Sequence, residues 1–230
     1  MKSTQDLHNL QSSLSQAFDR IGITQEIKND SPLDDYSPQE LDQLAFLIEK
    51  LETKLDEIRH NPKTIEESLD QRLLIRLGNY YFFQGDSYQA IEYYDLSNQV
   101  EENEWAHYNS ALILESQDQL NVAYDKYEQA IKLKPDFPQA LRHQANILTS
   151  QGKTELAIKK LLKSRKLNPN DPDTNKLLAE YYIEHGEKNE ALTHLKAIHY
   201  RDSSVTDQIE ELEKKSSFLG RVSSFFRKKD

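Results

Sequence analysis

The sequence predicts an all-α protein: a solenoid of about four stacked helix pairs, with further helices at both ends. The first observation behind this prediction is a fixed period, by which Ala111 recurs as Ala145 and Pro135 recurs as Pro169. A period of this length is the signature of a stacked repeat array. The second observation is that helix-length amphipathic segments, separated by Gly, Asp or Pro, fill each period.

The period extends in both directions from this central stretch. Gly152 recurs one full period later as Gly186, and Ala111 corresponds to Gly78 in a preceding unit that is one position shorter. In each unit a leading and a trailing helix are expected to pack closely through Gly or Ala, with larger side chains filling the space between them. The array is expected to cover 71–205, with units at 71–103, 104–137, 138–171 and 172–205.

An N-terminal helical region, 1–70, is expected before the array, with helices at about 4–21 and 38–60. The second of these starts at Ser37-Pro38-Gln39-Glu40, which offers an N-cap, a proline at the first helical position and a capping-box Glu. Between the two helices, 23–36 has no hydrophobic period. It is interpreted as a linker that separates elements rather than packing against them.

The second helix carries an apolar stripe in alternating steps of three and four residues: Leu41, Leu44, Ile48, Leu51, Leu55 and Ile58. Two interpretations are open. The stripe is either a coiled-coil seam that makes a homodimer through 38–60, or it packs within the chain against helix 4–21 or the first repeat. The flanking Ala45, Phe46 and Leu47 widen the stripe and favour packing within the chain.

A second capping box, from Thr64 to Glu67, follows the break at Asn61-Pro62. It predicts that the leading helix of the first repeat is long, from about 65 to 83.

Composition favours a soluble helical protein. Hydrophobic residues make up 37% of the chain and charged residues 30%, with a formal net charge of −10. No apolar run approaches the roughly 20 residues of a membrane span, and the acidic total disfavours nucleic acid as a partner. The sequence holds no cysteine and starts without a secretory signal pattern, so the expected location is the cytoplasm.

Two segments are expected after the array. Residues 206–216 are expected to form a helix that caps the last repeat, with Ile209 and Leu212 on its apolar side. Residues 217–230 form a basic tail with apolar residues at helical spacing, which either folds back on the array or contacts a partner or a membrane surface. The tail residues that would make such contacts are Phe218, Leu219, Arg221, Val222, Phe225, Phe226, Arg227, Lys228 and Lys229.

No pattern of catalytic residues stands out. The sequence has no Gly-rich phosphate loop, no His-Glu-x-x-His and no Gly-x-Ser-x-Gly. His194 and His199 are five residues apart, so they do not share a helical face as a metal-binding pair would. We therefore expect no enzyme, no cofactor and no metal.

The repeat units resemble the tetratricopeptide repeat, whose pattern is Trp-x2-Leu-Gly-x2-Tyr, then Ala-x3-Phe, then Pro. The first unit is similar in Leu74-x2-Leu77-Gly78-x2-Tyr81 and in Ala90-x3-Tyr94. The resemblance implies a right-handed array (TPR) whose leading helices line a concave groove. It also implies a protein-interaction scaffold or adaptor, which binds an extended peptide or a helix of a partner protein in that groove.

The candidate partner-binding residues flank the small landmarks on the leading helices. They are Arg72, Arg76, Asn79, Phe83, Trp105, Tyr108, Asn109, Leu112, Arg142, His143 and Asn146. Aromatic, cationic and amide side chains of this kind can hold an extended backbone and attract carboxylates, so the expected ligand is a peptide or helix, with acidic segments favoured.

The sequence is also compatible with two alternative functions. In one, the chain is a peripheral membrane-associated assembly factor anchored by the 217–230 tail. In the other, it is a co-chaperone-like binder of acidic C-terminal peptides. Asn79 and Asn109 resemble the two asparagines of the carboxylate clamp used by such co-chaperones, whereas its three basic positions read Ile75, Gln139 and His143.

Overall fold

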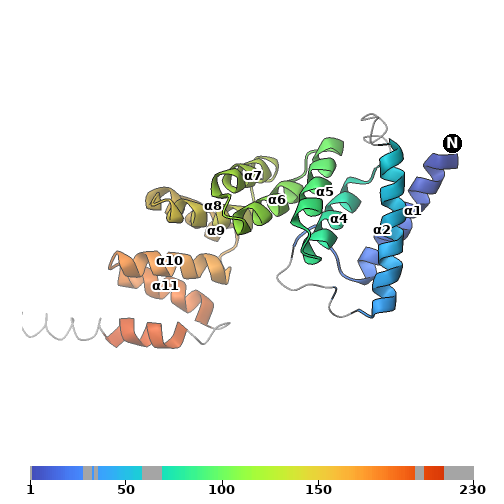
Figure 1. Cartoon of the computed structure of the whole chain (residues 1–230). Helices are drawn as coiled ribbons and strands as arrows, with labels where there is room; N and C mark the ends of the chain where they lie inside the picture. Colours follow the sequence, from blue (N-terminus) through green and yellow to red (C-terminus); the bar gives the residue numbers. More distant parts are fainter. Residues whose placement is uncertain (1, 28–32, 34–35, 59–68, 200–204, 215–230) are drawn as a thin grey trace, which may run out of the picture. The chain divides into compact units, whose positions relative to one another are not determined.

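The computed structural model describes residues 2–27, 33, 36–58, 69–199 and 205–214, and every regular element within these ranges is a helix (Figure 1). The chain divides into two compact units, Met1–Pro135 and Asp136–Asp230. We call them the N-terminal unit and the C-terminal unit and describe each by itself. The predicted all-α solenoid of helix pairs is confirmed.

The N-terminal unit contains a long helical hairpin and two repeat-type helix pairs. In the hairpin, α1 packs against α2; in the repeats, α4 packs against α5 and α6 against α7. The helices are α1 (Lys2–Arg20), α2 (Pro38–Ile58), α4 (Gln71–Phe83), α5 (Ser87–Val100), α6 (Glu104–Ser116) and α7 (Leu120–Leu133).

The apolar stripe of α2 packs inside the chain. Leu44, Ile48, Leu51 and Leu55 are buried in one cluster with side chains of α1, α4 and α5. Four of the six side chains on which a coiled-coil homodimer through 38–60 depended are thus used within the N-terminal unit, while the flanking Phe46 stays 54% exposed.

The leading helix of the first repeat is shorter than predicted. Leu69 and Asp70 are not helical, and α4 begins at Gln71. The Asp70 carboxylate accepts from the backbone N–H groups of Arg72 and Leu73 at 2.8 and 3.3 Å, and so satisfies two orphan donors of the first turn. The backbone N–H of Asp70 donates to Gln11 Oε1 at 2.8 Å. A helix running without interruption from residue 65 was therefore a wrong prediction.

The small landmark residues allow close helix packing, as the sequence predicted. Gly78 of α4 lies against the ring of Tyr94 of α5, and an added Cβ would collide with that ring. Tyr94 is fully buried, so a large side chain fills the space that the missing side chain leaves.

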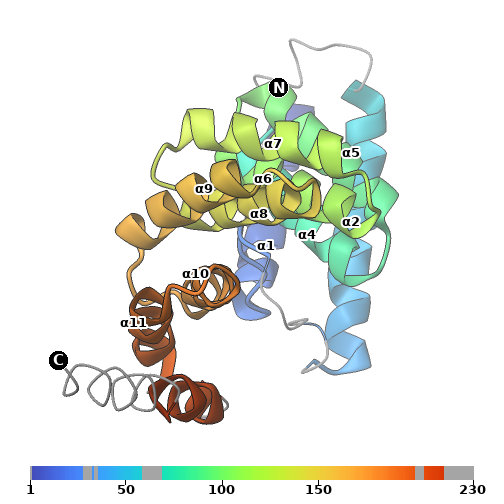
Figure 2. The same ribbon diagram turned by 90° about the vertical axis from the view of Figure 1, so that its left-hand side faces the viewer.

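The C-terminal unit repeats the helix-pair design. Its helices are α8 (Pro138–Ser150), α9 (Thr154–Leu167), α10 (Pro172–Glu184) and α11 (Lys188–His199), followed by helical residues 206–214. Figure 2 shows α10 and α11 lying side by side. Ile209 and Leu212 of the last helical segment pack against the buried Ala179, Leu195 and Ile198.

Within the ranges that the structure describes, no helix is long and apolar enough to cross a membrane. The basic tail predicted at 217–230 lies outside those ranges.

Candidate functional site

The leading helices α4 and α6 bring three of the predicted contact residues together. Arg76 and Asn109 occupy equivalent positions in successive repeats, since they are as far apart along the chain as Gly78 and Ala111. Asn79 lies one turn after Arg76 on α4, so it shares a helical face with Arg76. All three side chains are buried, with exposed fractions of 9%, 0% and 0% for Arg76, Asn79 and Asn109.

The two asparagines are held in one orientation by hydrogen bonds. Asn109 Nδ2 donates to Asn79 Oδ1 at 2.8 Å, and the Tyr94 hydroxyl donates to the same oxygen at 2.6 Å. Burial raises the pKa of Tyr94 well above its usual value, so the hydroxyl keeps its proton and remains a donor. Both amide Nδ2 groups are thereby directed at an acceptor outside the network.

That acceptor is the chain's own backbone. Asn79 Nδ2 donates to the carbonyl of Thr24 at 2.5 Å, and Asn109 Nδ2 donates to the carbonyl of Gln25 at 2.7 Å. Arg76 Nε donates to the carbonyl of Ile23 at 2.7 Å. Three side chains of α4 and α6 therefore hold the carbonyls of three consecutive residues. We call Ile23–Gln25 the cis segment, and we call Arg76, Asn79 and Asn109 the α4–α6 face.

The turn at the end of α1 delivers the cis segment to this face. Gly22 adopts a left-handed conformation with φ of 71°, and the Ile23 N–H donates to the Phe18 carbonyl at 3.1 Å. This six-to-one bond is that of a Schellman-type helix end, where glycine avoids the strain of a side chain. The prediction that 23–36 only separates the two helices was therefore wrong for residues 23–25.

Arg76 ties the cis segment to α1 as well. Its two Nη atoms donate to Ser15 Oγ at 3.0 Å, to the Ser15 carbonyl at 3.2 Å and to the Asp19 carboxylate at 2.8 Å. The guanidinium carbon also lies 5.2 Å from the centre of the Phe18 ring. The predicted partner-binding arginine thus already binds two carbonyls, a hydroxyl and a carboxylate of its own chain.

One hydrogen-bond acceptor of the α4–α6 face has no donor within the described part of the chain. Asn109 Oδ1 is buried and has no hydrogen-bond partner among the residues that the structure describes. Buried amide oxygens are almost always paired, so the cis segment uses only the donor half of the Asn109 amide.

The remaining predicted residues of α4 and α6 surround this face or pack away from it. Trp105 makes an edge-to-face contact with Tyr108 at 6.0 Å, and the Lys134 ammonium lies 4.8 Å from the centre of the Trp105 ring. Tyr108 is buried and Leu112 is half-buried. Arg72 is exposed, whereas Phe83 packs against the main apolar cluster.

In the C-terminal unit, α8 carries the other predicted residues. Arg142 forms ion pairs with Asp171 at 3.6 Å and with Asp173 at 3.2 Å, and so ties α8 to the start of α10. His143 and Asn146 are half-buried on α8. Arg142 has a structural role that the sequence did not suggest.

The carboxylate-clamp alternative finds no support at its first basic position. Ile75, which stands at that position, is fully buried in an apolar cluster with Tyr94 and Ala106. The two asparagines of the motif remain, and they bind backbone carbonyls.

His194 is a buried histidine whose surroundings the sequence did not reveal. Its Nδ1 lies 2.9 Å from Asn175 Oδ1, and its ring stacks on Tyr182 at 5.5 Å. Asn175 uses its Nδ2 to donate to the carbonyls of Pro169 and Asp171, so His194 must carry its proton on Nδ1. Burial lowers the pKa of His194 to about 4, with a smaller contribution from Arg165.

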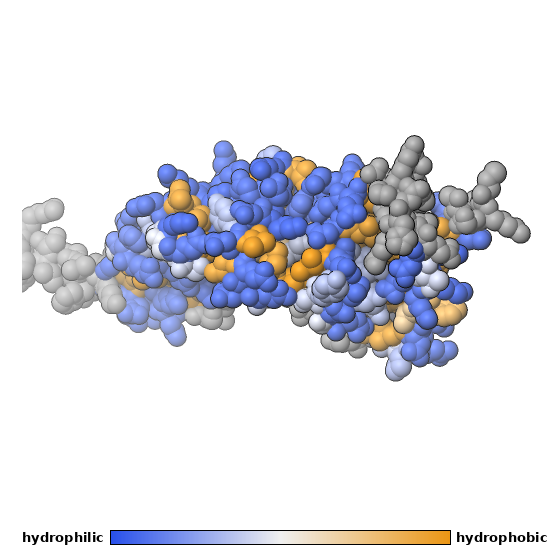
Figure 3. Space-filling view, turned by 45° about the horizontal axis from the view of Figure 1, so that its top comes forward, coloured by the Kyte–Doolittle hydropathy of each residue, from blue (hydrophilic) through white to orange (hydrophobic). Residues whose placement is uncertain are grey.

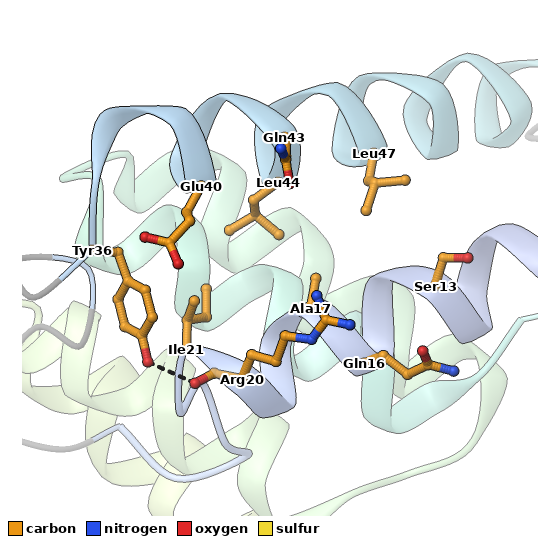
Figure 4. Close-up of a pocket in the computed structure, with 10 residues that line it drawn as sticks. All are labelled: Ser13, Gln16, Ala17, Arg20, Ile21, Tyr36, Glu40, Gln43, Leu44 and Leu47. Atoms are coloured by element: carbon orange, nitrogen blue, oxygen red, sulfur yellow. Dashed lines mark hydrogen bonds between the residues drawn. The ribbon is translucent and has the colours of Figure 1, made fainter.

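A pocket of about 300 Å³ lies between α1 and α2 (Figure 4). The Tyr36 hydroxyl donates to the Arg20 carbonyl at 2.6 Å on one side of it. Glu40, the carboxylate at its rim, accepts from the Ser37 backbone N–H and hydroxyl in the capping box at the start of α2. We interpret this pocket as a seam of the helical hairpin, because the Glu40 carboxylate already serves the capping box of α2.

No group of three or more His, Asp or Glu side chains within the described ranges could hold a metal ion. Figure 3 shows the apolar side chains of one face as separate patches in a largely hydrophilic surface. Large apolar residues are exposed on several helices: Phe46, Tyr88, Val122, Leu133, Leu156, Leu162 and Ile183. Isolated exposed side chains of this kind are normal, so the α4–α6 face remains the candidate site.

Comparison with known proteins supports the repeat architecture. The tetratricopeptide repeat family model matches residues 71–103 and 106–137. A crystal structure of the MamA protein is similar with a TM-score of 0.57 and 16% identity, over 90% of this chain and 95% of that one. YrrB, described as a TPR protein with an unusual peptide-binding site, is similar with a TM-score of 0.55 and 18% identity, over 70% and 82% of the two chains. No curated protein matches the sequence.

Proposed function

Since this chain contains tetratricopeptide repeats, a fold that generally serves protein interaction, we propose that it is a non-enzymatic scaffold that holds an extended segment of a partner protein. The segment would lie on the α4–α6 face, with Trp105 and Leu112 beside it on α6. Fold alone does not specify function, so the proposal rests on the chemistry of this face.

The observation that carries the proposal is the set of three hydrogen bonds to consecutive carbonyls. Arg76, Asn79 and Asn109 donate to the Ile23, Thr24 and Gln25 carbonyls at 2.7, 2.5 and 2.7 Å. These bonds contact only the backbone carbonyls of the cis segment, and a segment of another protein can offer the same acceptors. These three donors support the proposal that the α4–α6 face can hold the backbone of a partner segment.

YrrB, a protein of similar fold, is described as having a peptide-binding site. This likeness agrees with the proposal at the level of the fold.

A test should block the space beside the face without touching the residues that hold the cis segment. Leu112 is suitable, because it is half-buried and lies one turn after Asn109 on α6. Leu112→Glu would place a charge where an apolar contact is proposed. Val122→Glu, on the trailing helix α7 at a site 48% exposed, is the matched control for the added charge.

The measurement is affinity capture from the native host's lysate, with circular dichroism to verify that both variants fold. Proteins that wild type and Val122→Glu retain and Leu112→Glu loses are the expected result. Retention of the same proteins by all three forms would contradict binding on this side of the N-terminal unit.

A membrane-associated role through the 217–230 tail remains a second proposal on sequence grounds. Three phenylalanines and four basic residues in this tail are suited to an anionic lipid surface. Flotation with anionic vesicles should depend on the tail, and equal flotation of the full chain and a 1–216 truncation would contradict this role.

A further inference from the structure

We propose that the cis segment is a built-in competitor for the α4–α6 face, which a partner segment of the same chemistry must displace. That chemistry is a short stretch with a branched aliphatic residue followed by two residues whose backbone carbonyls accept hydrogen bonds from the face, as in Ile23-Thr24-Gln25. This inference rests on the proposed function and adds the class of ligand and the control of the site.

The way the cis segment is held supports the ligand class. Ile23 is 1% exposed and belongs to the main apolar cluster. The Thr24 side chain, in contrast, is exposed, and the Gln25 side chain is half-buried. The main apolar cluster therefore holds the Ile23 side chain, and the α4–α6 face holds the three carbonyls. The Thr24 hydroxyl donates to the Glu26 carbonyl of its own segment at 3.1 Å.

Asn109 supplies an independent observation that points to another ligand. Its Oδ1 is buried and unpaired within the described part of the chain, although the Nδ2 of the same amide has two acceptors. An extended peptide carries N–H groups as well as carbonyls, so a partner segment in a suitable register can satisfy this oxygen. The cis segment is thus an incomplete ligand that a better one can replace.

Competition of this kind has a measurable consequence. When a site is open for only a fraction of the time, the apparent dissociation constant rises by the inverse of that fraction. Any change that weakens the cis segment without touching the face should therefore tighten binding of an added peptide.

Gly22 offers such a change. Its φ of 71° is strained for any other residue, and no atom lies within 4 Å of the position of an added Cβ. Gly22→Ala should therefore weaken the turn that presents the cis segment by strain alone. Gly186→Ala is the matched control, because Gly186 has a φ of 73° and equally open surroundings in the C-terminal unit.

The experiment uses the full-length chain and a fluorescently labelled peptide of residues 18–27, Phe-Asp-Arg-Ile-Gly-Ile-Thr-Gln-Glu-Ile. Anisotropy would give the peptide's dissociation constant. We expect Gly22→Ala to bind about five- to thirtyfold more tightly than wild type, the range that corresponds to the strain of one left-handed residue. Gly186→Ala should match wild type, and adding Asn79→Ala and Asn109→Ala to Gly22→Ala should abolish binding.

Two results would overturn the inference in distinguishable ways. If wild type and Gly22→Ala bind the peptide with equal affinity, while the variant that also carries Asn79→Ala and Asn109→Ala does not bind, the proposed function stands. The cis segment would then not be a competitor. Absence of binding to every form at millimolar peptide would show that the face does not take such a segment from outside, and would count against the proposed function as well.

Discussion

The N-terminal and C-terminal units are built from the same helix pair, yet their leading helices meet different neighbours. On α4 and α6, Arg76, Asn79 and Asn109 are buried beneath the cis segment. On α8, the repeat-equivalent residues of Asn109 and Asn79 are His143 and Asn146, which are only half-buried. The repeat thus places polar residues at equivalent positions of the leading helices. A segment from outside the repeat, the cis segment, covers these residues on α4 and α6.

The interiors of the two units differ as well. The N-terminal unit pairs Gly78 with the large Tyr94, whereas the C-terminal unit has Ala145 and Leu161 at the equivalent positions. The C-terminal unit instead buries a polar pair, Asn175 with His194. Each unit should therefore fail under a different perturbation, which gives four predictions.

The largest expected effect is acid destabilisation of the C-terminal unit through His194. Its pKa is lowered from 6.5 to about 4 in the folded state, so the unfolded chain binds the extra proton first. Its contribution to stability is complete above pH 6.5 and is lost as the pH falls towards 4. The shift corresponds to about 3 kcal/mol.

Two signals separate the units in this measurement. Trp105, the sole tryptophan of the chain, reports on the N-terminal unit, and circular dichroism reports on both units. Urea unfolding at pH 4.5 should show an early dichroism phase that Trp105 fluorescence does not follow. His194→Gln, which keeps a donor but does not titrate, should reduce the pH dependence of that phase. If the pH dependence of the dichroism phase is the same in His194→Gln as in wild type, groups other than His194 cause it.

A smaller loss is expected from Gly78→Ala in the N-terminal unit. The new Cβ would collide with the ring of Tyr94, which also donates to Asn79. Overpacking of this kind costs about 2 kcal/mol, and Trp105 fluorescence during urea unfolding should record it. Ala145→Gly, the reverse exchange at the equivalent site, should leave that signal unchanged. A Gly78→Ala protein of wild-type stability would mean that Tyr94 has room to move.

The third prediction compares the two arginines under the same substitution. Arg76→Met removes charge-assisted hydrogen bonds from buried carbonyls and should cost about 2 kcal/mol. Arg142→Met removes an ion pair with Asp173, which is 61% exposed, and a longer one, 3.6 Å, with Asp171, which is 21% exposed, and should cost less than Arg76→Met. Equal losses in urea unfolding would contradict the special role of Arg76.

The smallest effect is expected at the hairpin seam. Tyr36→Phe removes the hydrogen bond to the Arg20 carbonyl, which is worth about 0.5–1 kcal/mol. Thermal unfolding followed by dichroism should show a slight decrease in the melting temperature. A decrease as large as that of Gly78→Ala would mean that the seam contributes more to the N-terminal unit than its single hydrogen bond.

The sequence predicted the helix pairs because the repeat is a local signal. Ala111, Ala145 and their neighbours repeat at a fixed distance, and close helix packing needs small residues wherever they recur. The start of α4 was missed because the capping box at Thr64 and Glu67 competes with the Asp70 cap, whose anchor is Gln11 on another helix.

The sequence also predicted Arg76, Asn79 and Asn109 as candidate contact residues. It did not predict that they bind the cis segment. The bonds from Arg76 to Ile23 and from Asn109 to Gln25 join residues 53 and 84 positions apart. A periodic pattern holds no information on such contacts, and the cis segment itself has no period. Ile23 was the only available signal: an aliphatic residue directly after a helix-ending glycine, where Schellman-type ends place an apolar contact.

The most direct test of the account is an NMR titration of the ¹⁵N-labelled full-length chain with the unlabelled peptide of residues 18–27. Only signals of the protein are observed, so release of the cis segment can be separated from binding of the peptide. If the cis segment is a competitor, the backbone signals of Thr24 and Gln25 move to random-coil values while the side-chain amide of Asn109 stays in its hydrogen-bonded position. Unchanged Thr24 and Gln25 signals at saturating peptide would show that the segment is a fixed part of the fold and would contradict the account.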